Sequence, residues 1–180
     1  MLNDQEEEQV VETPMGDDDI KRYFPSAKIE VYSDLSKYDN IDELLPSDKS
    51  FMFMLIEDSP NKGHWVCLSR YNDMIEFFDS YGGQPDSQLK WNNTNTNEKL
   101  GQGKKLLSGL LNNFNGKVVY NPVKYQSDGS DVNTCGRHCT FRIQNMKSGK
   151  NLDDYFKYMK QLKNSMDRTY DEVVSQFIRE

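Results

Sequence analysis

The spacing of apolar residues changes several times along this chain, and each spacing predicts a different kind of element. Residues 50–56 form a continuous apolar run, which is typical of a central strand that is buried on both faces. Alternating apolar and polar positions predict four more strands, over residues 27–32, 63–71, 74–81 and 117–120. A helical repeat of apolar residues predicts helices over 17–24, 98–114, 134–146 and 152–178, the last in two pieces around 164–169.

The order of these elements favours one fold class. The three central strands follow one another directly, with no helix expected between them. This order predicts an α+β fold, with a mostly antiparallel mixed sheet flanked by helices, rather than a doubly wound βαβ fold. The polar segments 84–97 and 125–133 are expected to be surface loops.

The negative charge of the chain is concentrated at its N-terminal end. The 180 residues carry a net charge of −7, and residues 1–20 hold eight of the 29 acidic side chains and none of the 22 basic ones. The remaining chain is close to neutral, which argues against a strongly basic nucleic-acid-binding protein. Because residues 1–16 have no repeating apolar face, we expect a flexible acidic arm in front of a single domain of residues 17–180.

A predicted hairpin brings a histidine and a carboxylate together. The turn is expected at Asn72-Asp73, and this register places Tyr81 opposite His64. Asp79 is then the diagonal neighbour of His64 on the same face of the sheet, with Cα atoms roughly 7–8 Å apart. A carboxylate against one imidazole nitrogen stabilises the imidazolium, as a general base requires. The alternatives are a purely structural hydrogen bond, or a shifted register that separates the two residues.

The three cysteines are expected to play different roles. Their odd number fits a reducing compartment better than a disulfide framework. Cys135 lies at the predicted start of a helix, where the helix N-terminus favours the thiolate form of a nucleophile. Cys67 faces away from His64 along its strand, and Cys139 lies one turn inside the helix. Both are therefore expected to be core residues.

A zinc site is the rival interpretation of the same side chains. The five candidate ligands are His64, Cys67, Cys135, His138 and Cys139. Their spacing disfavours a metal, because the first two point to opposite faces of a strand and no Cys-x-x-Cys pair is present. We therefore expect neither a metal nor a cofactor.

The order of the motifs resembles that of the adenovirus maturation protease and the SUMO-specific proteases. It reads Gly63-His64-Trp65, then Phe78-Asp79-Ser80, then Gln126, then Cys135-Gly136. The resemblance extends from about Asp17 to Ile178, and it is greatest to the maturation proteases of virophages, Maverick-type transposons and large DNA viruses. It implies a cysteine protease of this α+β fold, with its nucleophile at the N-terminus of a buried helix.

The resemblance also implies a role for each matching residue. His64 corresponds to the general base, Asp79 to the acid that orients it, and Cys135 to the nucleophile. Gln126 corresponds to the residue whose side-chain amide binds the oxyanion, beside the backbone N–H of Cys135.

Two positions in this assignment have alternatives. The step from Gln126 to the nucleophile is longer than is usual in the family, so Asn133 and Gln84 are alternative oxyanion donors. Trp65 matches the aromatic residue that follows the family's histidine, which implies a place in the substrate cleft. Its alternative is a core position on the face opposite His64.

The implied activity is that of a cysteine endopeptidase that cleaves capsid or other virion precursors at glycine or other small residues. Two alternatives stay open: a protease that removes a ubiquitin-like modifier, and a non-catalytic virion protein of the same fold. We expect a monomer in the virion and the host-cell cytoplasm, with no membrane segment and no signal peptide. No nucleic-acid or peptide activator is indicated, because the lysines at 157, 160 and 163 are typical of a solvated helix face.

Overall fold

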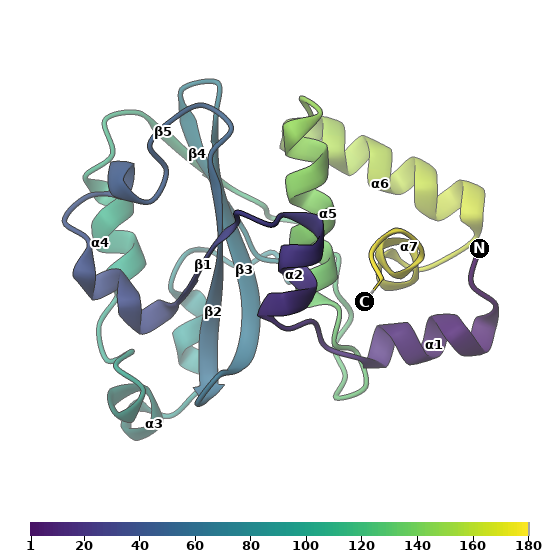
Figure 1. The fold of residues 1–180 in the computed structure, drawn as a ribbon, viewed down its shortest axis with the longest axis horizontal. Coiled ribbons are helices and arrows are strands. Elements are labelled where there is room, and N and C mark those ends of the chain that lie inside the picture. The colour runs from purple at the N-terminus through teal and green to yellow at the C-terminus, as the bar shows by residue number, and fades with distance from the viewer. Residues whose placement is uncertain (180) are drawn as a thin grey trace.

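Five strands form the centre of the structure, and the computed structural model surrounds them with helices over the described residues, 1–179 (Figure 1). The strands are β1 (Lys28–Val31), β2 (Phe51–Ser59), β3 (Lys62–Tyr71), β4 (Met74–Phe78) and β5 (Lys117–Tyr120). The α-helices are α1 (Asp4–Glu12), α2 (Asp17–Tyr23), α3 (Thr94–Lys99), α4 (Leu106–Asn112), α5 (Cys135–Lys147), α6 (Leu152–Met166) and α7 (Tyr170–Phe177). Three 3-10 helices are η1 (Tyr32–Lys37), η2 (Ile41–Glu43) and η3 (Ser87–Trp91).

The sheet is mixed, with its strands in the order of the sequence, β1-β2-β3-β4-β5. The two central pairs, β2 with β3 and β3 with β4, are antiparallel, whereas each edge strand runs parallel to its neighbour. The predicted α+β class, with a mixed sheet flanked by helices, is confirmed.

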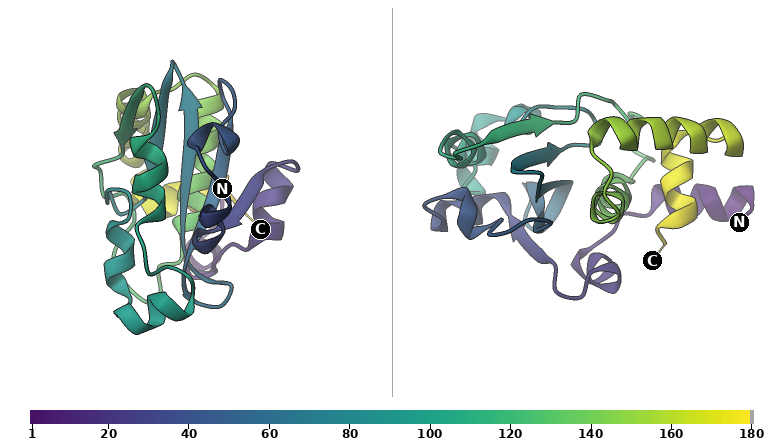
Figure 2. Two further views of the ribbon diagram at one scale, coloured as in Figure 1. Left: turned by 90° about the vertical axis from the view of Figure 1, so that its left-hand side faces the viewer. Right: turned by 90° about the horizontal axis from the view of Figure 1, so that it is seen from above.

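Helices cover both faces of this sheet (Figure 2). On one face, α2, α5, α6 and α7 pack against side chains such as Trp65 and Phe78. On the other face, η1, η2 and α4 pack against side chains such as Val66 and Phe77. A strand covered on both faces needs apolar residues at every position, which explains the unbroken apolar run of β2. Within residues 1–179, none of the helices is both long and apolar enough to span a membrane.

The hairpin of β3 and β4 has the predicted register. Tyr71 pairs with Met74, and Cys67 pairs with Phe78. Both turn residues, Asn72 and Asp73, adopt positive φ angles of 49° and 59°, as a two-residue hairpin turn requires. The pairing ends at Phe78, so the next residue, Asp79, lies just beyond the end of β4.

The predicted helix over 98–114 is wrong in its first half. The chain instead ends α3 at Lys99, passes through Gly101 at a φ of 73°, and begins α4 at Leu106. The segment 84–97 is likewise more than a loop, because it holds η3 and most of α3. Three of its polar side chains, Asp86, Gln88 and Asn97, are buried, and each is hydrogen-bonded: Asn97, for example, donates to the carbonyl of Leu89. The polar composition of 84–97 therefore predicted a loop where the chain forms η3 and most of α3.

The prediction of a flexible arm over residues 1–16 is also wrong. Part of this segment forms α1, which packs against α7. Two of its acidic side chains, Asp4 and Glu7, each lie 3.1 Å from the guanidinium of Arg168. Met15, which follows α1, is buried in the core. The acidic residues have partners near the other end of the chain, so their local composition did not reveal the contact.

Replacing Glu7 by Ala tests the docking of α1. Glu7 is buried and accepts hydrogen bonds from Arg168 and Gln176. We expect the free energy of unfolding to fall by about 2 kcal/mol, because charged hydrogen bonds to a buried group are lost. The matched control is Glu8→Ala on the exposed side of α1, with an expected change within about 0.5 kcal/mol. Urea denaturation measures both, and equal effects would mean that α1 is not docked.

Candidate active site

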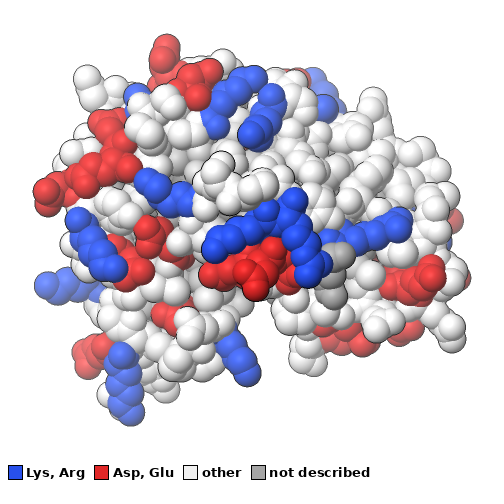
Figure 3. Space-filling model, viewed as in Figure 1, with Lys and Arg blue, Asp and Glu red and all other residues white. Residues whose placement is uncertain are grey.

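A cavity of about 620 Å³ opens at one end of the sheet, between two walls of the molecule. One wall holds the end of β2, the start of β3 and the end of η3, and the other holds the segment 124–133. Figure 3 shows this region as a notch in the lower edge of the molecule. Three of the predicted site residues, His64, Gln126 and Cys135, line this cavity together.

His64 and Asp79 form a hydrogen bond at the ends of two paired strands. His64 lies near the start of β3, and Asp79 directly follows β4. The imidazole Nε2 lies 2.7 Å from the carboxylate Oδ1, and both side chains are buried. The imidazole also stacks on Tyr81, with ring centroids 5.1 Å apart. Because the carboxylate accepts the proton on Nε2, the second nitrogen, Nδ1, is left as the basic one.

Asp79 has more donors around it than the sequence indicated. The side-chain amide of Gln88 donates to Oδ2 at 2.7 Å, and the backbone N–H of Tyr81 donates to Oδ1 at 3.0 Å. Gly83 makes this close approach possible, because a Cβ there would lie 2.8 Å from Oδ2 and 2.9 Å from the Gln88 amide nitrogen. Gln88 lies in the segment predicted to be a loop, and no local pattern marked it as buried.

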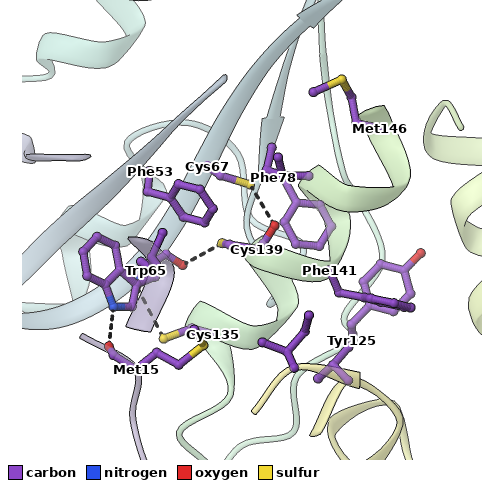
Figure 4. Close-up of a cluster of buried hydrophobic side chains, with 14 of the residues drawn as sticks. Met15, Phe53, Trp65, Cys67, Phe78, Tyr125, Cys135, Cys139, Phe141 and Met146 are labelled. Atoms are coloured by element: carbon purple, nitrogen blue, oxygen red, sulfur yellow. Dashed lines mark hydrogen bonds between the residues drawn. The ribbon is translucent and has the colours of Figure 1, made fainter. Parts of the chain in front are cut away.

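Cys135 is the first residue of α5, and it lines the cavity. The sulfur is 3.5 Å from the backbone nitrogen of Trp65, a contact drawn in Figure 4. The helix N-terminus and this N–H group both favour a negatively charged sulfur. The expected placement of Cys135 at a helix start is confirmed.

The surroundings of Cys135 and His64 shift the pKa values of the two groups in opposite directions. Burial raises the pKa of the Cys135 thiol, but the hydrogen bond and charge of His64 outweigh it and lower the pKa below its usual value. Burial lowers the pKa of His64, whereas its hydrogen bonds to Asp79 and Cys135 raise it to about 9. Burial likewise raises the pKa of Asp79, and its bonds from His64 and Gln88 bring it below the ordinary value. These shifts all act in the direction of a thiolate on Cys135 and an imidazolium on His64.

The other two cysteines are core residues, as expected. Cys67 and Cys139 are 1% and 0% exposed. The thiol of Cys139 contacts the carbonyl of Trp65 at 3.5 Å, away from the cavity (Figure 4). Burial raises the pKa of Cys139 well above its ordinary value, which disfavours its thiolate. Within residues 1–179, no three or more His, Cys, Asp or Glu side chains are grouped to hold a metal ion.

Gln126 faces the cavity with its amide fixed at both ends. Its Oε1 accepts a hydrogen bond from Ser80 at 2.7 Å, and its Nε2 donates to the carbonyl of Val132 at 3.2 Å. Since an amide nitrogen carries two hydrogens, one stays available for a ligand. The alternative donors have other partners: Asn133 donates to the carbonyl of Glu12, and Gln84 donates to the hydroxyl of Tyr120.

The expected place of Trp65 in the substrate cleft is wrong. Its side chain is 4% exposed, packs in the core opposite His64, and donates its indole N–H to the carbonyl of Met15 at 2.9 Å. Trp91 at the end of η3 lines the cavity instead, with 55% of its surface exposed. Its ring meets that of His64 edge-on, with centroids 5.1 Å apart. A lone tryptophan in a polar, Asn-rich stretch was the signal that could have identified it.

Two of three comparisons with known proteins found a similar chain. No family model matches it. Over 150 residues it is 38% identical to the uncharacterized protein V9 of Sputnik virophage, and the alignment covers 83% of this chain and 84% of V9. Among solved structures, the SUMO protease Ulp1, with its catalytic cysteine oxidized to a sulfinic acid, aligns with 99% of this chain and 97% of its own. That alignment has 16% identity and a TM-score of 0.39, values too low to carry a functional argument.

Titration of the histidines tests the electrostatics of the site. The chain has only two histidines, so the signals of isotope-labelled histidine are assigned with a His64→Gln variant. We expect His64 to stay protonated up to a pKa of about 9, above its ordinary value of 6.5, because Asp79 and Cys135 hold its proton. Cys135→Ala should lower that pKa, since one of the two partners is removed. NMR titration measures both. A pKa near 6.5 in the wild-type protein, unchanged in the variant, would contradict the pairing.

Proposed function

We propose that this chain, which belongs to the same protein family as V9 of Sputnik virophage, is a cysteine peptidase. The observation that carries the proposal is that His64 and Cys135 interact and line the same cavity, while Asp79 holds His64 from behind through a hydrogen bond. A thiol at a helix start, an imidazole beside it and a carboxylate behind the imidazole are the parts that nucleophilic amide hydrolysis requires.

The first chemical step forms a thioester. The Cys135 thiolate attacks the carbonyl carbon of the scissile peptide bond, a C–S bond forms, and the carbonyl π electrons move onto oxygen. The oxyanion then collapses and the C–N bond breaks. The His64 imidazolium gives its proton to the departing nitrogen, so that an amine leaves and a neutral imidazole remains.

The second step restores the enzyme. The neutral imidazole of His64 takes a proton from water while the water oxygen attacks the thioester carbon. The C–S bond breaks, the new carboxylic acid leaves, and the thiolate and imidazolium are regenerated. Asp79 stays ionised in both steps, and it holds the imidazole in one tautomer and one orientation.

The negative charge on the carbonyl oxygen needs donors that are already in place. We assign this role to the backbone N–H of Cys135 and to the free hydrogen on Gln126 Nε2. The hydrogen bond to the carbonyl of Val132 supports the assignment, because a carbonyl can only accept and therefore fixes which end of the Gln126 amide carries the nitrogen. A single preorganised donor of this kind is worth about 10²–10³ in rate.

The proposed substrate is a capsid protein or another virion precursor. A virophage relative that aligns over most of the chain supports a role in a virus-like element. Extended peptide would enter the notch between the two walls, with the exposed ring of Trp91 against it. Incubating the protein with the capsid protein of the same virus-like element, and sequencing the new termini, tests this directly. Release of a folded ubiquitin-like modifier without capsid cleavage would favour a deconjugating protease instead.

Two cysteines of α5, Cys135 and Cys139, can be substituted in turn to distinguish the nucleophile from a core residue. We expect Cys135→Ala to abolish cleavage, because no other cysteine lines the cavity among residues 1–179. Cys139→Ala, one turn further along α5, is the matched control and should keep most of the activity. Circular dichroism verifies folding, and cleavage rates are measured on both. Cleavage that survives Cys135→Ala would sink the assignment.

Substitution of the carboxylate should cost less than loss of the nucleophile. We expect Asp79→Asn to lower kcat by about 10²–10⁴, because Asp79 orients the base and takes no part in bond making. His64→Ala should approach the loss seen for Cys135→Ala. The comparison is made from kcat at saturating substrate. If Asp79→Asn retained wild-type kcat, the carboxylate would be a structural partner only.

A further inference from the structure

Asp171 lies behind the site, outside the cavity at which the substrate is proposed to bind. It is the second residue of α7, and its side chain points inward with 3% of its surface exposed. Three donors surround its carboxylate. The backbone N–H of Ser127 lies 3.0 Å from Oδ2, while the Thr134 hydroxyl and His138 Nε2 lie 2.6 Å and 2.9 Å from Oδ1.

The positions of these donors in the chain are the informative feature. Ser127 directly follows Gln126, the assigned oxyanion donor, and Thr134 directly precedes Cys135. Gln126 and Cys135 stand at opposite ends of the segment 126–135. The hydrogen bond from Gln126 to the carbonyl of Val132 connects the two ends of this segment. One buried carboxylate thus binds the backbone next to the oxyanion amide and the side chain next to the nucleophile.

The carboxylate of Asp171 is charged, and it acts on the start of α5 through the residue before that helix, Thr134. Burial raises the pKa of Asp171, but the hydrogen bonds from His138, Thr134 and Ser127 lower it below its ordinary value. Thr134 precedes the first turn of α5 and makes no side-chain capping hydrogen bond, and its hydroxyl donates to Asp171. His138 adds a third attachment, one turn into α5. The hydrogen bonds from Thr134 and His138 to Asp171 therefore hold the start of α5 against α7.

We propose that Asp171 is a positioning residue that sets the distance between the two oxyanion donors, the Gln126 amide and the Cys135 N–H. The inference rests on the proposed peptidase function. It differs from the role of Asp79, which acts on the imidazole, because Asp171 contacts neither His64 nor the thiol in any hydrogen bond of the described residues. A donor misplaced by about 1 Å can cost about 10²-fold in rate.

Asp171→Asn tests the proposal with little change of shape. The charge of the carboxylate is lost, and the new NH₂ group either faces the Ser127 N–H, which then loses its acceptor, or requires Thr134 and His138 to change from donors to acceptors. Asp153→Asn is the matched control, because Asp153 is also the second residue of its helix, α6, but is exposed. Both helices then lose the same first-turn charge, and only Asp171 loses the contacts to the segment 126–135.

Three measurements on each variant separate positioning from stability. The first is kcat and KM for hydrolysis of N-acetylglycine p-nitrophenyl ester, which requires an oxyanion. The second is the inhibition constant of acetyl-Gly-Gly-aldehyde, whose adduct places an oxygen at the oxyanion position. The third is the rate of Cys135 alkylation by iodoacetamide, a displacement that needs the thiolate but no oxyanion donor.

For Asp171→Asn we expect kcat to fall by about 10–10²-fold with KM within about threefold, and the aldehyde affinity to fall in parallel. The alkylation rate should stay within about threefold, and Asp153→Asn should change nothing beyond about twofold. Unchanged kcat in folded Asp171→Asn, or equal losses of kcat and alkylation rate, would overturn the inference.

A second variant covers the case in which Asp171→Asn does not fold. Thr134→Val removes one donor to the carboxylate and keeps the shape of the side chain, and it should lower kcat at least threefold while leaving alkylation unchanged. If kcat stays within twofold, Asp171 does not position the site. Failure of the proposed function is distinct, because the wild-type protein would then neither hydrolyse the ester nor alkylate preferentially at Cys135.

Discussion

The buried carboxylate of Asp79 is the constraint on which the candidate site depends. A carboxylate at 0% exposure carries a large desolvation cost unless protein donors surround it. Its donors come from β3, from η3 and from its own turn, while its backbone carbonyl accepts from Asn121 after β5. Satisfying the carboxylate and the backbone carbonyl of Asp79 therefore holds four segments in one arrangement around the imidazole of His64. The same segments form much of the wall that Trp91 completes.

The parts of this arrangement that sequence could predict are those set by neighbouring residues. The Asn72-Asp73 turn fixes the hairpin register, and the register alone brings Asp79 within reach of His64. The start of α5 could also be predicted from neighbouring residues, because the apolar repeat begins at Cys135 after a polar segment. Alternation and helical repeat are local properties, so they survive without knowledge of the rest of the fold.

The parts that could not be predicted depend on polar contacts between distant residues. The local sequence predicts a solvated Glu7, but Arg168 and Gln176, which are distant in the chain, bind its carboxylate. Gln88 looked like a loop residue until Asp79 supplied its acceptor. Neither contact leaves a periodic trace, because a buried polar side chain is satisfied by one specific partner rather than by an apolar face. The same limitation misassigned Trp65, whose burial depends on Met15 from the segment after α1.

The central claim is that His64 makes Cys135 an activated thiolate, and one measurement tests it most directly. The folded protein is treated with iodoacetamide at neutral pH, and the alkylation rate of each cysteine is followed by mass spectrometry. Cys135 should react at least about 100-fold faster than Cys67 and Cys139, and the advantage should diminish in His64→Ala, since only the thiolate attacks. Equal rates for all three thiols, or a Cys135 rate that His64→Ala leaves unchanged, would contradict the account.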